Sequence, residues 1–250
     1  MTPFLINCLT ICLAAALIRR NAWKAYPFFC VYIFFSIVDS IALLLVQKHY
    51  LVFFIGYWSS QVVYSVLSLL ALQDVFRDIF RSFYGLFQWF WMIFPGAIVT
   101  FFLTSICFVI LHPPTEAVGL ARVVLSFGLI DGYIRLGLFW LFLVLMTLLG
   151  IRRRSYGFGI IEGFTALALG DLLGFGLRYT FGTHYNTLVT YASPAGFLCA
   201  VILWLSAFLR PPAPAVVHYG EELATPEQLL IRIKARTGSL NRLLWKPHIS

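Results

Sequence analysis

The sequence predicts an all-α polytopic membrane protein, a bundle of seven transmembrane helices, on three observations. Hydrophobic residues make up 61% of the 250 residues and charged residues only 11%, whereas about 25% of a typical soluble domain is charged. The apolar residues lie in long runs, without the alternating segments of about ten residues that are typical of membrane β-strands. Lysine and arginine gather in every second connection between these runs, a distribution typical of multi-pass membrane proteins.

Seven apolar runs define the expected helices. Each contains at least 17 residues, within the range of about 17–25 that a transmembrane helix needs. The first run has no basic leader and is followed by Arg19 and Arg20, so we expect an uncleaved first helix rather than a signal peptide. Pro95 should bend the fourth helix and Pro194 the seventh. The expected spans cover residues 3–19, 27–46, 51–73, 86–111, 121–149, 157–180 and 186–209.

The basic residues also predict the orientation. Fourteen of the 18 lysines and arginines would lie on one side of the membrane and only Lys48 and Arg178 on the other, with Arg122 and Arg135 in or beside the fifth helix. Because cytoplasmic loops carry the excess of lysine and arginine, we expect the N-terminus outside the cell membrane and the C-terminus in the cytoplasm. This topology accounts for the net charge of +8, so nucleic acid is not an expected partner.

The domain organisation follows from the same pattern. Residues 1–210 form the expected transmembrane domain, 211–224 a proline-rich linker, and 225–250 a basic amphipathic cytoplasmic tail. The tail begins with Thr225-Pro226-Glu227-Gln228, a capping box with proline at the first helical position. Such a helix can lie on the anionic inner leaflet or dock to a cytoplasmic partner.

Several chemistries that are common in helical membrane proteins are not expected here. A retinal pigment needs a lysine in the last span, and residues 186–209 contain none. Haem ligation needs histidines within the helices, and the histidines lie in expected loops or in the tail. No HExxH motif, serine elbow or CxxC pair occurs. We therefore expect no catalytic residues, no metal and no cofactor, and hence no enzyme.

Ionisable residues within the apolar runs are the candidates for function, because each costs a few kcal/mol to insert into a bilayer. Asp131 and Arg135 are spaced i, i+4 in the order that favours an ion pair. A polar stripe on the third helix adds hydroxyl and amide groups, and these groups can also serve as interhelical hydrogen-bond partners. The candidate residues for ligand or ion binding are Asp39, Gln61, Tyr64, Asp131, Arg135, Asp171 and Arg178.

These residues predict either an outward-facing polar cavity or a structural charge network. In a cavity, an arginine fork would suit a carboxylate or phosphate group. Glu162 lies about one turn from the cytoplasmic end of its helix, so we expect it to form a salt bridge with the basic residues 152–154. The glycines of that helix should form one smooth face for close contact with a neighbouring helix. The expected packing residues are Gly159, Gly163, Gly170 and Gly174.

Three segments of the sequence resemble segments of other membrane proteins. They are AYPFFCVYIFFS at residues 25–36, ARVVLSFGLI at 121–130 and RRRSYGFGIIEGF at 152–164. With Trp58-Ser59 near the start of the third helix, they resemble a group of uncharacterised bacterial seven-helix membrane proteins. The resemblance covers most of residues 25–180. It implies the seven-helix topology and a bacterial inner membrane, and it carries no activity over to any residue.

Three main functions remain open at this point, with a lipid-modifying enzyme as a minor fourth alternative. The first is a receptor-like or sensory module that binds a small ligand or lipid in the outer half and acts through a cytoplasmic partner. The second is a small transporter that uses Asp39, Asp131 and Asp171 as proton or cation sites. The third is an accessory subunit of a larger membrane complex, with the glycine face as its interface to another membrane protein. The lipid bilayer is the expected surrounding in each case.

Overall fold

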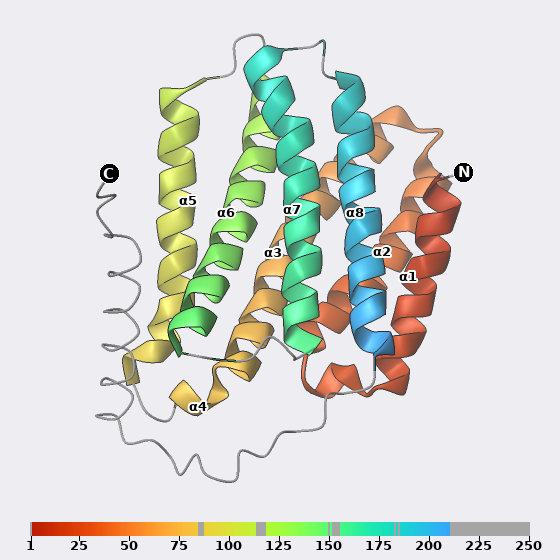
Figure 1. Ribbon diagram of the computed structural model, residues 1–250. Coiled ribbons are helices and arrows are strands. Elements are labelled where there is room, and N and C mark those ends of the chain that lie inside the picture. The colour runs from red at the N-terminus through yellow and green to blue at the C-terminus, as the bar shows by residue number, and fades with distance from the viewer. Residues whose placement is uncertain are drawn as a thin grey trace, which may run out of the picture.

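The computed structural model describes residues 2–84, 88–113, 119–149, 151, 156–182, 184 and 186–210, and this part of the chain is helical without any strand. The expected linker and tail, residues 211–250, lie outside the described residues. Seven long helices stand side by side, joined by short connections (Figure 1). Their bounds are α1 Thr2–Arg19, α2 Pro27–Val46, α3 Tyr50–Ile79, α5 Ile93–Leu111, α6 Leu120–Leu149, α7 Tyr156–Phe181 and α8 Asn186–Leu209.

Two short elements lie at the end of the bundle where α3 passes to α5. They are α4, Arg81–Tyr84, and a 3-10 turn over Gln88–Met92. We call this end, at the bottom of Figure 1, the α4 end. The opposite end, where α1 begins, is the N-terminus end. The α1–α2 connection, the end of α6 and the start of α7 lie at the α4 end (Figure 1).

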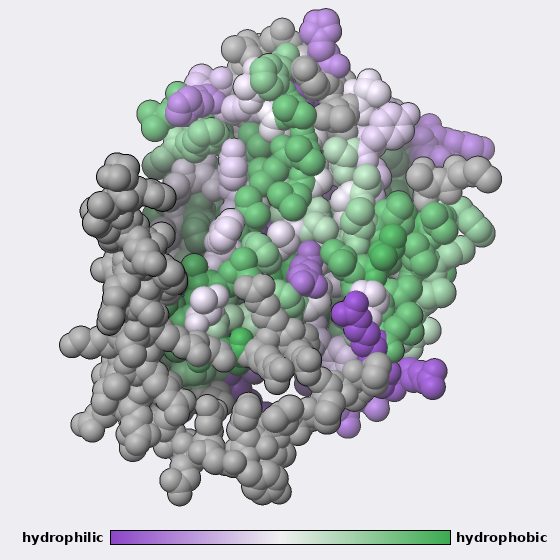
Figure 2. Space-filling model, viewed as in Figure 1, coloured by the Kyte–Doolittle hydropathy of each residue, from purple (hydrophilic) through white to green (hydrophobic). Residues whose placement is uncertain are grey.

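Six of the described helices are long and apolar enough to cross a membrane. The first apolar helix, Phe4–Arg19, is shorter. Large hydrophobic side chains are exposed along most helices, and they cover much of the face in Figure 2 between more polar ends. An exposed apolar surface of this extent is suited to lipid rather than water. The chain therefore has the architecture of a multi-pass helical membrane protein. The six candidate spans are Pro27–Val46, Tyr50–Ile79, Trp89–Leu111, Leu120–Leu149, Tyr156–Phe181 and Thr190–Leu209.

Two helix boundaries differ from the sequence-based expectation. Helix α3 continues past residue 73 to Ile79, and its last turns carry aspartates that accept hydrogen bonds from Phe28 of α2 and from Tyr26 just before α2. Helix α5 begins at Ile93 rather than near residue 86, after the 3-10 turn. Pro95 therefore lies in the first turn of α5, where its missing N–H costs no intrahelical hydrogen bond. In α8, Pro194 lies inside one continuous helix.

The aspartates of α3 fasten the start of α2. Asp74 Oδ2 accepts a hydrogen bond of 3.0 Å from the backbone N–H of Phe28, one of the free N–H groups at the α2 N-terminus. Tyr26 donates a hydrogen bond of 2.5 Å to Asp78 Oδ2. Burial, the hydrogen bond to Asp78 and its negative charge together raise the pKa of the Tyr26 phenol. A neighbouring helix thus supplies the negative charge that a helix N-terminus favours.

Helices α7 and α8 make the closest backbone contact in the bundle. A Cβ on Gly170 would lie only 2.8 Å from the backbone oxygen of Ala192. A Cβ on Gly163 would overlap the indole of Trp204, and one on Gly159 would overlap Ala207. Gly174, the fourth expected packing residue, is also buried. At Gly159, Gly163 and Gly170 the glycine face is therefore occupied by α8.

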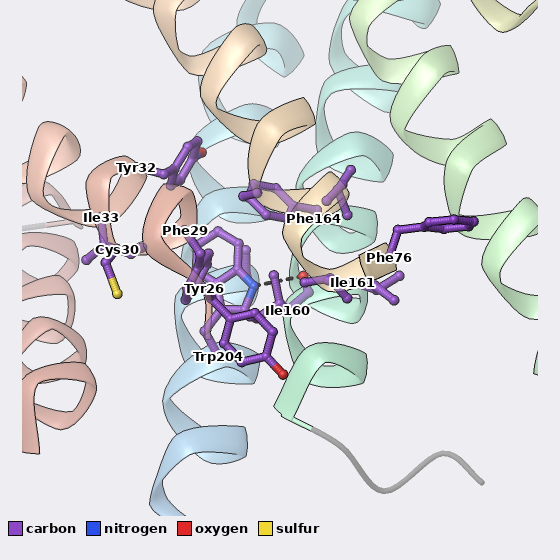
Figure 3. Packing of buried hydrophobic residues seen from close by; sticks show 14 of the residues in the cluster. Tyr26, Phe29, Cys30, Tyr32, Ile33, Phe76, Ile160, Ile161, Phe164 and Trp204 are labelled. Carbon is purple, nitrogen blue, oxygen red and sulfur yellow. Dashed lines mark hydrogen bonds between the residues drawn. The ribbon is translucent and has the colours of Figure 1, made fainter. Parts of the chain in front are cut away.

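Buried aromatic side chains fill the bundle toward the α4 end. Phe29 and Phe164 pack edge-on around Trp204, with ring centroids 5.2 and 5.1 Å from it (Figure 3). Trp204 Nε1 donates a hydrogen bond of 3.0 Å to the Ile160 carbonyl oxygen. The core extends across the bundle to Phe76 and Phe142. We call Phe29, Tyr32, Phe76, Phe142, Phe164 and Trp204 the aromatic layer.

Buried residues are distributed unevenly along the helices. Among the described side chains of α1, α2, α3 and α8, buried ones occur from the middle of each helix to the α4 end. In α3, for example, the first buried residue is Ser68, well past the midpoint. Helices α6 and α7 have buried residues along most of their length. Helix α5 has buried residues toward the N-terminus end, Ser105 and Val109, and Leu125, Leu129 and Tyr179 pack together there. It is therefore on the side formed by α1, α2, α3 and α8 that side chains are more exposed toward the N-terminus end.

Replacing Gly163 with alanine should destabilise the bundle. The added methyl group overlaps the fully buried Trp204 ring, and overpacking of this kind costs about 1–3 kcal/mol. Gly176→Ala on the same helix is the matched control, because its Cβ would lie 3.7 Å from Leu129, an ordinary contact. Thermal unfolding in detergent should show a lower midpoint for Gly163→Ala alone. Equal midpoints for the two variants would contradict the packing described here.

Candidate functional site

Arg135 lies in the middle of the bundle. It is roughly 20 Å along α6 from either end of the helix, at 1.5 Å per residue, and its side chain is only 4% exposed. A buried guanidinium loses its hydration, so its position is stable only where partners compensate the charge and the N–H groups. Three helices provide these partners.

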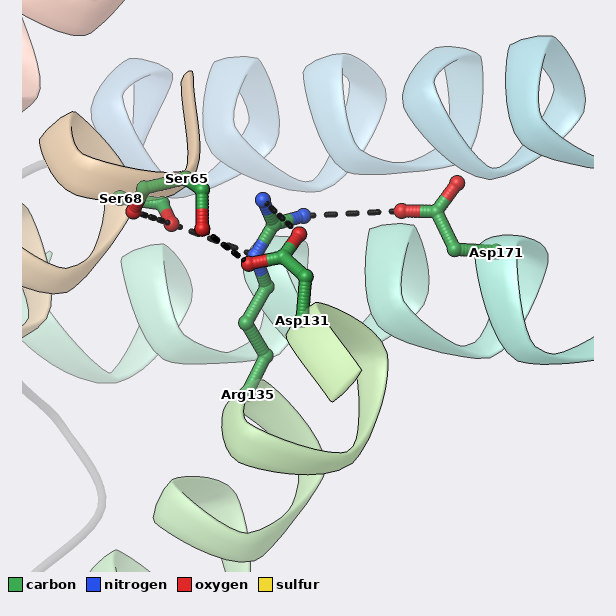
Figure 4. Close-up of polar contacts among 5 residues, drawn as sticks. All are labelled: Ser65, Ser68, Asp131, Arg135 and Asp171. Carbon is green, nitrogen blue, oxygen red and sulfur yellow. Dashed lines mark hydrogen bonds and ion pairs between the residues drawn. The ribbon is translucent and has the colours of Figure 1, made fainter. Parts of the chain in front are cut away.

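The guanidinium directs each of its three nitrogen atoms to a different residue (Figure 4). Nη2 lies 2.5 Å from Asp131 Oδ2 on the same helix. Nε donates a hydrogen bond of 3.2 Å to Ser68 Oγ on α3. Nη1 lies 3.6 Å from Asp171 Oδ2 on α7. Arg135 therefore connects α3, α6 and α7 through charged or charge-assisted contacts, which are the stronger kind of hydrogen bond.

Asp131 has partners for both carboxylate oxygens. Oδ2 faces Arg135, and Oδ1 accepts a hydrogen bond of 2.5 Å from Ser65 Oγ. Ser68 Oγ in turn donates to the Ser65 carbonyl oxygen at 2.8 Å. The two serines of the predicted α3 stripe thus complete the shell around the Asp131–Arg135 pair. We call Ser65, Ser68, Asp131, Arg135 and Asp171 the central network.

Asp171 is bound more loosely than Asp131. Its side chain is 16% exposed, against 11% for Asp131, and its oxygen lies about 1 Å farther from the guanidinium. Ser193 of α8 lies beside the Asp171 carboxylate. The Ser193 hydroxyl oxygen is buried, and among the described residues no hydrogen-bond partner meets it. The central network therefore has two acidic groups and one basic group, with the buried Ser193 hydroxyl beside Asp171.

Asp39 belongs to a second polar cluster rather than to the central network. It accepts hydrogen bonds from Ser60 Oγ at 2.5 Å and from Tyr64 OH at 3.1 Å. The Tyr57 phenol, one turn along α3, interacts electrostatically with both Asp39 and Asp171. The three acids expected near one another therefore form two groups, because the polar stripe of α3 divides between α2 and α6. Tyr57 lies between the two groups.

Three other predicted residues have weaker connections to the site. Gln61 is half-buried between the two clusters, with no described contact of its amide. Arg178 is also half-buried, and within the described residues it forms no ion pair with Asp171. Asp171 pairs with Arg135 instead. Glu162 is exposed on α7. Its expected partners, residues 152–154, lie outside the described residues.

The sequence-based reasoning missed three residues that matter for this arrangement. Asp74 and Asp78 lay beyond the expected end of the third helix, although their i, i+4 spacing signals a continued helical face. Tyr32 lies within an apolar run of the sequence, but it is buried and lies within electrostatic range of Asp131, Arg135 and Asp171. Within the described residues, no three histidine, cysteine or acidic side chains gather as a metal site would require.

The fold and this site define a multi-pass helical membrane protein with a charged network at the centre of its bundle. No model of a known protein family matches the chain, and no match is found among curated proteins or among solved structures. The function is therefore inferred from the contacts of these residues alone.

Replacing Arg135 with glutamine should be strongly destabilising. It leaves two buried carboxylates without a counter-ion, and breaking a buried ion pair by removing one partner costs about 3–5 kcal/mol. The double variant Asp131→Asn/Arg135→Gln removes one charge of each sign and should recover part of this loss. Glu162→Gln, exposed on α7, serves as the control and should unfold like the unmodified protein. If Arg135→Gln also unfolds like the unmodified protein, the network does not hold the helices together.

Proposed function

We propose that the chain is a seven-span protein of the cell membrane, with its N-terminus outside and its C-terminus in the cytoplasm. Helix α1 is 18 residues long, about 27 Å at 1.5 Å per residue, and it packs against α2 and α8. With α1 as a span, fourteen of the 18 lysines and arginines belong to the α4 end and the segments connected to it. The positive-inside rule then puts this end in the cytoplasm. The N-terminus end is then the outer end.

We further propose a receptor-like function, in which a small polar ligand reaches the central network from outside. One observation carries this proposal: polar residues lie on the outer side of the aromatic layer, where the side chains of α1, α2, α3 and α8 are more exposed than toward the α4 end. Phe76, Phe142 and Phe164 each lie seven or eight residues toward the α4 end from Ser68, Arg135 and Asp171, respectively. Buried aromatic side chains therefore close the cytoplasmic side of the site.

The same helices offer a route from the site to the cytoplasm. Helix α3 carries Ser65 and Ser68 in the network, and Asp74 and Asp78 at the junction with α2. Helix α7 begins at this junction, where Gly157 lies next to the Tyr26 hydroxyl. A ligand that changes the contacts of Arg135 would shift α3 relative to α7, and this shift would reach the cytoplasmic loops. A separate cytoplasmic partner would then read it.

A coupled transporter is the second candidate, and the charge of the network favours it. Two aspartates share one arginine, which leaves one negative charge available for a proton or a cation. A transporter differs from a receptor in requiring access to this charge from both sides of the membrane. The accessory-subunit hypothesis has less support, because α8 already occupies the glycine face.

Cysteine accessibility tests the proposed function. The five native cysteines are replaced with serine or alanine, and Gln61→Cys is introduced between the two polar clusters. In sealed vesicles, a membrane-impermeant thiol reagent should label Gln61→Cys from the outer side only. Lys48→Cys and Lys24→Cys report which side is outer and which is cytoplasmic. Val66→Cys, exposed to lipid on the same helix, is the matched control and should not react.

Each outcome distinguishes between the functions. Labelling from the outer side alone supports a receptor-like site. Labelling from both sides, in separate preparations, would replace it with the transporter. If Gln61→Cys reacts from neither side while Lys48→Cys reacts, water does not reach the polar clusters and the proposed site is wrong.

A further inference from the structure

We propose that the central network binds one exchangeable proton, carried by Asp171, and that this proton is the ligand of the site. The inference rests on the proposed function, because the proton must reach Asp171 from the outer side. It goes further by naming the ligand and the residue that holds it.

The charge of the network requires a further positive charge. Arg135 neutralises one carboxylate, so two ionised aspartates would leave one net negative charge near the middle of the bundle. An uncompensated charge in a membrane interior costs several kcal/mol. Within the described residues no second basic side chain contacts the network. A proton compensates the charge with a single atom, whereas a metal ion would need several more oxygen ligands.

The contacts identify which aspartate takes the proton. Asp131 has Arg135 at 2.5 Å and a hydroxyl donor, Ser65, on its other oxygen, so a proton on either oxygen would displace one of these contacts. Asp171 has the same arginine only at 3.6 Å. It is also the more exposed of the two, so a proton from the outer side reaches it more readily.

The groups that face Asp171 from the surrounding helices fit this assignment. Tyr57 of α3 and Tyr32 of α2 are the titratable groups within electrostatic range of it on those helices, and as neutral phenols they add no charge of either sign. Asp131, across the guanidinium, is a like charge that disfavours a second ionised carboxylate. On α8, the Ser193 oxygen is buried and unpaired among the described residues. The hydroxyl can accept a hydrogen bond from a protonated Asp171 and donate one to an ionised Asp171, so it accommodates both states.

Proton uptake would change the contact between α6 and α7. The proton adds to one oxygen of Asp171, no covalent bond breaks, and the ion pair with Arg135 becomes a contact between a neutral acid and a cation. Asp131, Ser65 and Ser68 keep their contacts with one another and with Arg135. The effect is therefore confined to the α7 side of the network, and the network responds to the pH of the outer solution.

Infrared difference spectroscopy tests this assignment on the full chain in lipid nanodiscs. Lowering the pH should produce the carbonyl stretching band of a protonated carboxylic acid, and raising the pH should remove it. Because other carboxylic acids of the chain also titrate, the assignment rests on one component of this band. This component should be absent in Asp171→Asn and should shift in Ser193→Ala, which removes the hydrogen-bond partner. Glu162→Gln, the matched control on the same helix, should retain the band. Circular dichroism establishes that each variant is folded.

The results separate this inference from the proposed function. A band that persists in Asp171→Asn and is lost in Asp131→Asn assigns the proton to the other aspartate and overturns the inference. The inference is also overturned if the unmodified protein shows no such titrating band, even where Gln61→Cys reacts from outside.

Asp171→Glu provides the second variant if Asp171→Asn does not fold. It should show a titrating band at a shifted pH, and the absence of that band would overturn the inference. If the band behaves as expected but Gln61→Cys reacts from neither side, the proposed function fails instead.

Discussion

The cost of burying one guanidinium determines much of this structure. Arg135 lies about as far from water as a residue of α6 can, and its burial is tolerable only while three helices direct oxygen atoms toward it. A lipid bilayer offers little hydrophobic drive for helix association, so such polar contacts fix the relative rotation of α3, α6 and α7. The apolar surfaces can then face lipid without specifying which helix lies next to which.

The helix positions could be predicted from the sequence because each apolar run has to match the thickness of a bilayer. The ion pair of Asp131 with Arg135 was also predictable, since it depends only on the i, i+4 spacing within one helix. Contacts between helices could not be predicted in this way. That Arg135 reaches Ser68 and Asp171 depends on how α3 and α7 rotate and slide against α6, and helices that face lipid carry little periodic signal for this.

The division of the acids shows the same limit. Asp39, Asp131 and Asp171 have similar depths in their helices, which suggested one common site. In the structure, neighbouring hydroxyl groups on α3 point to different helices, so Tyr64 bonds Asp39 while Ser65 bonds Asp131. One residue along an α-helix turns the side chain by about 100°, and this is enough to send adjacent donors to separate partners. Depth alone does not determine which polar groups meet.

The close contact of α7 with α8 has a consequence for motion. Where Gly170 meets Gly196, no flexible side chain lies between the two backbones, so the helices can neither slide nor rotate freely against each other. Asp171 and Ser193 both belong to this rigid pair, whereas Arg135 and the α3 serines belong to other helices. The central network thus lies between the closely packed pair α7 and α8 and the less constrained helices α3 and α6. Any rearrangement takes place along the boundary between α7 and α6.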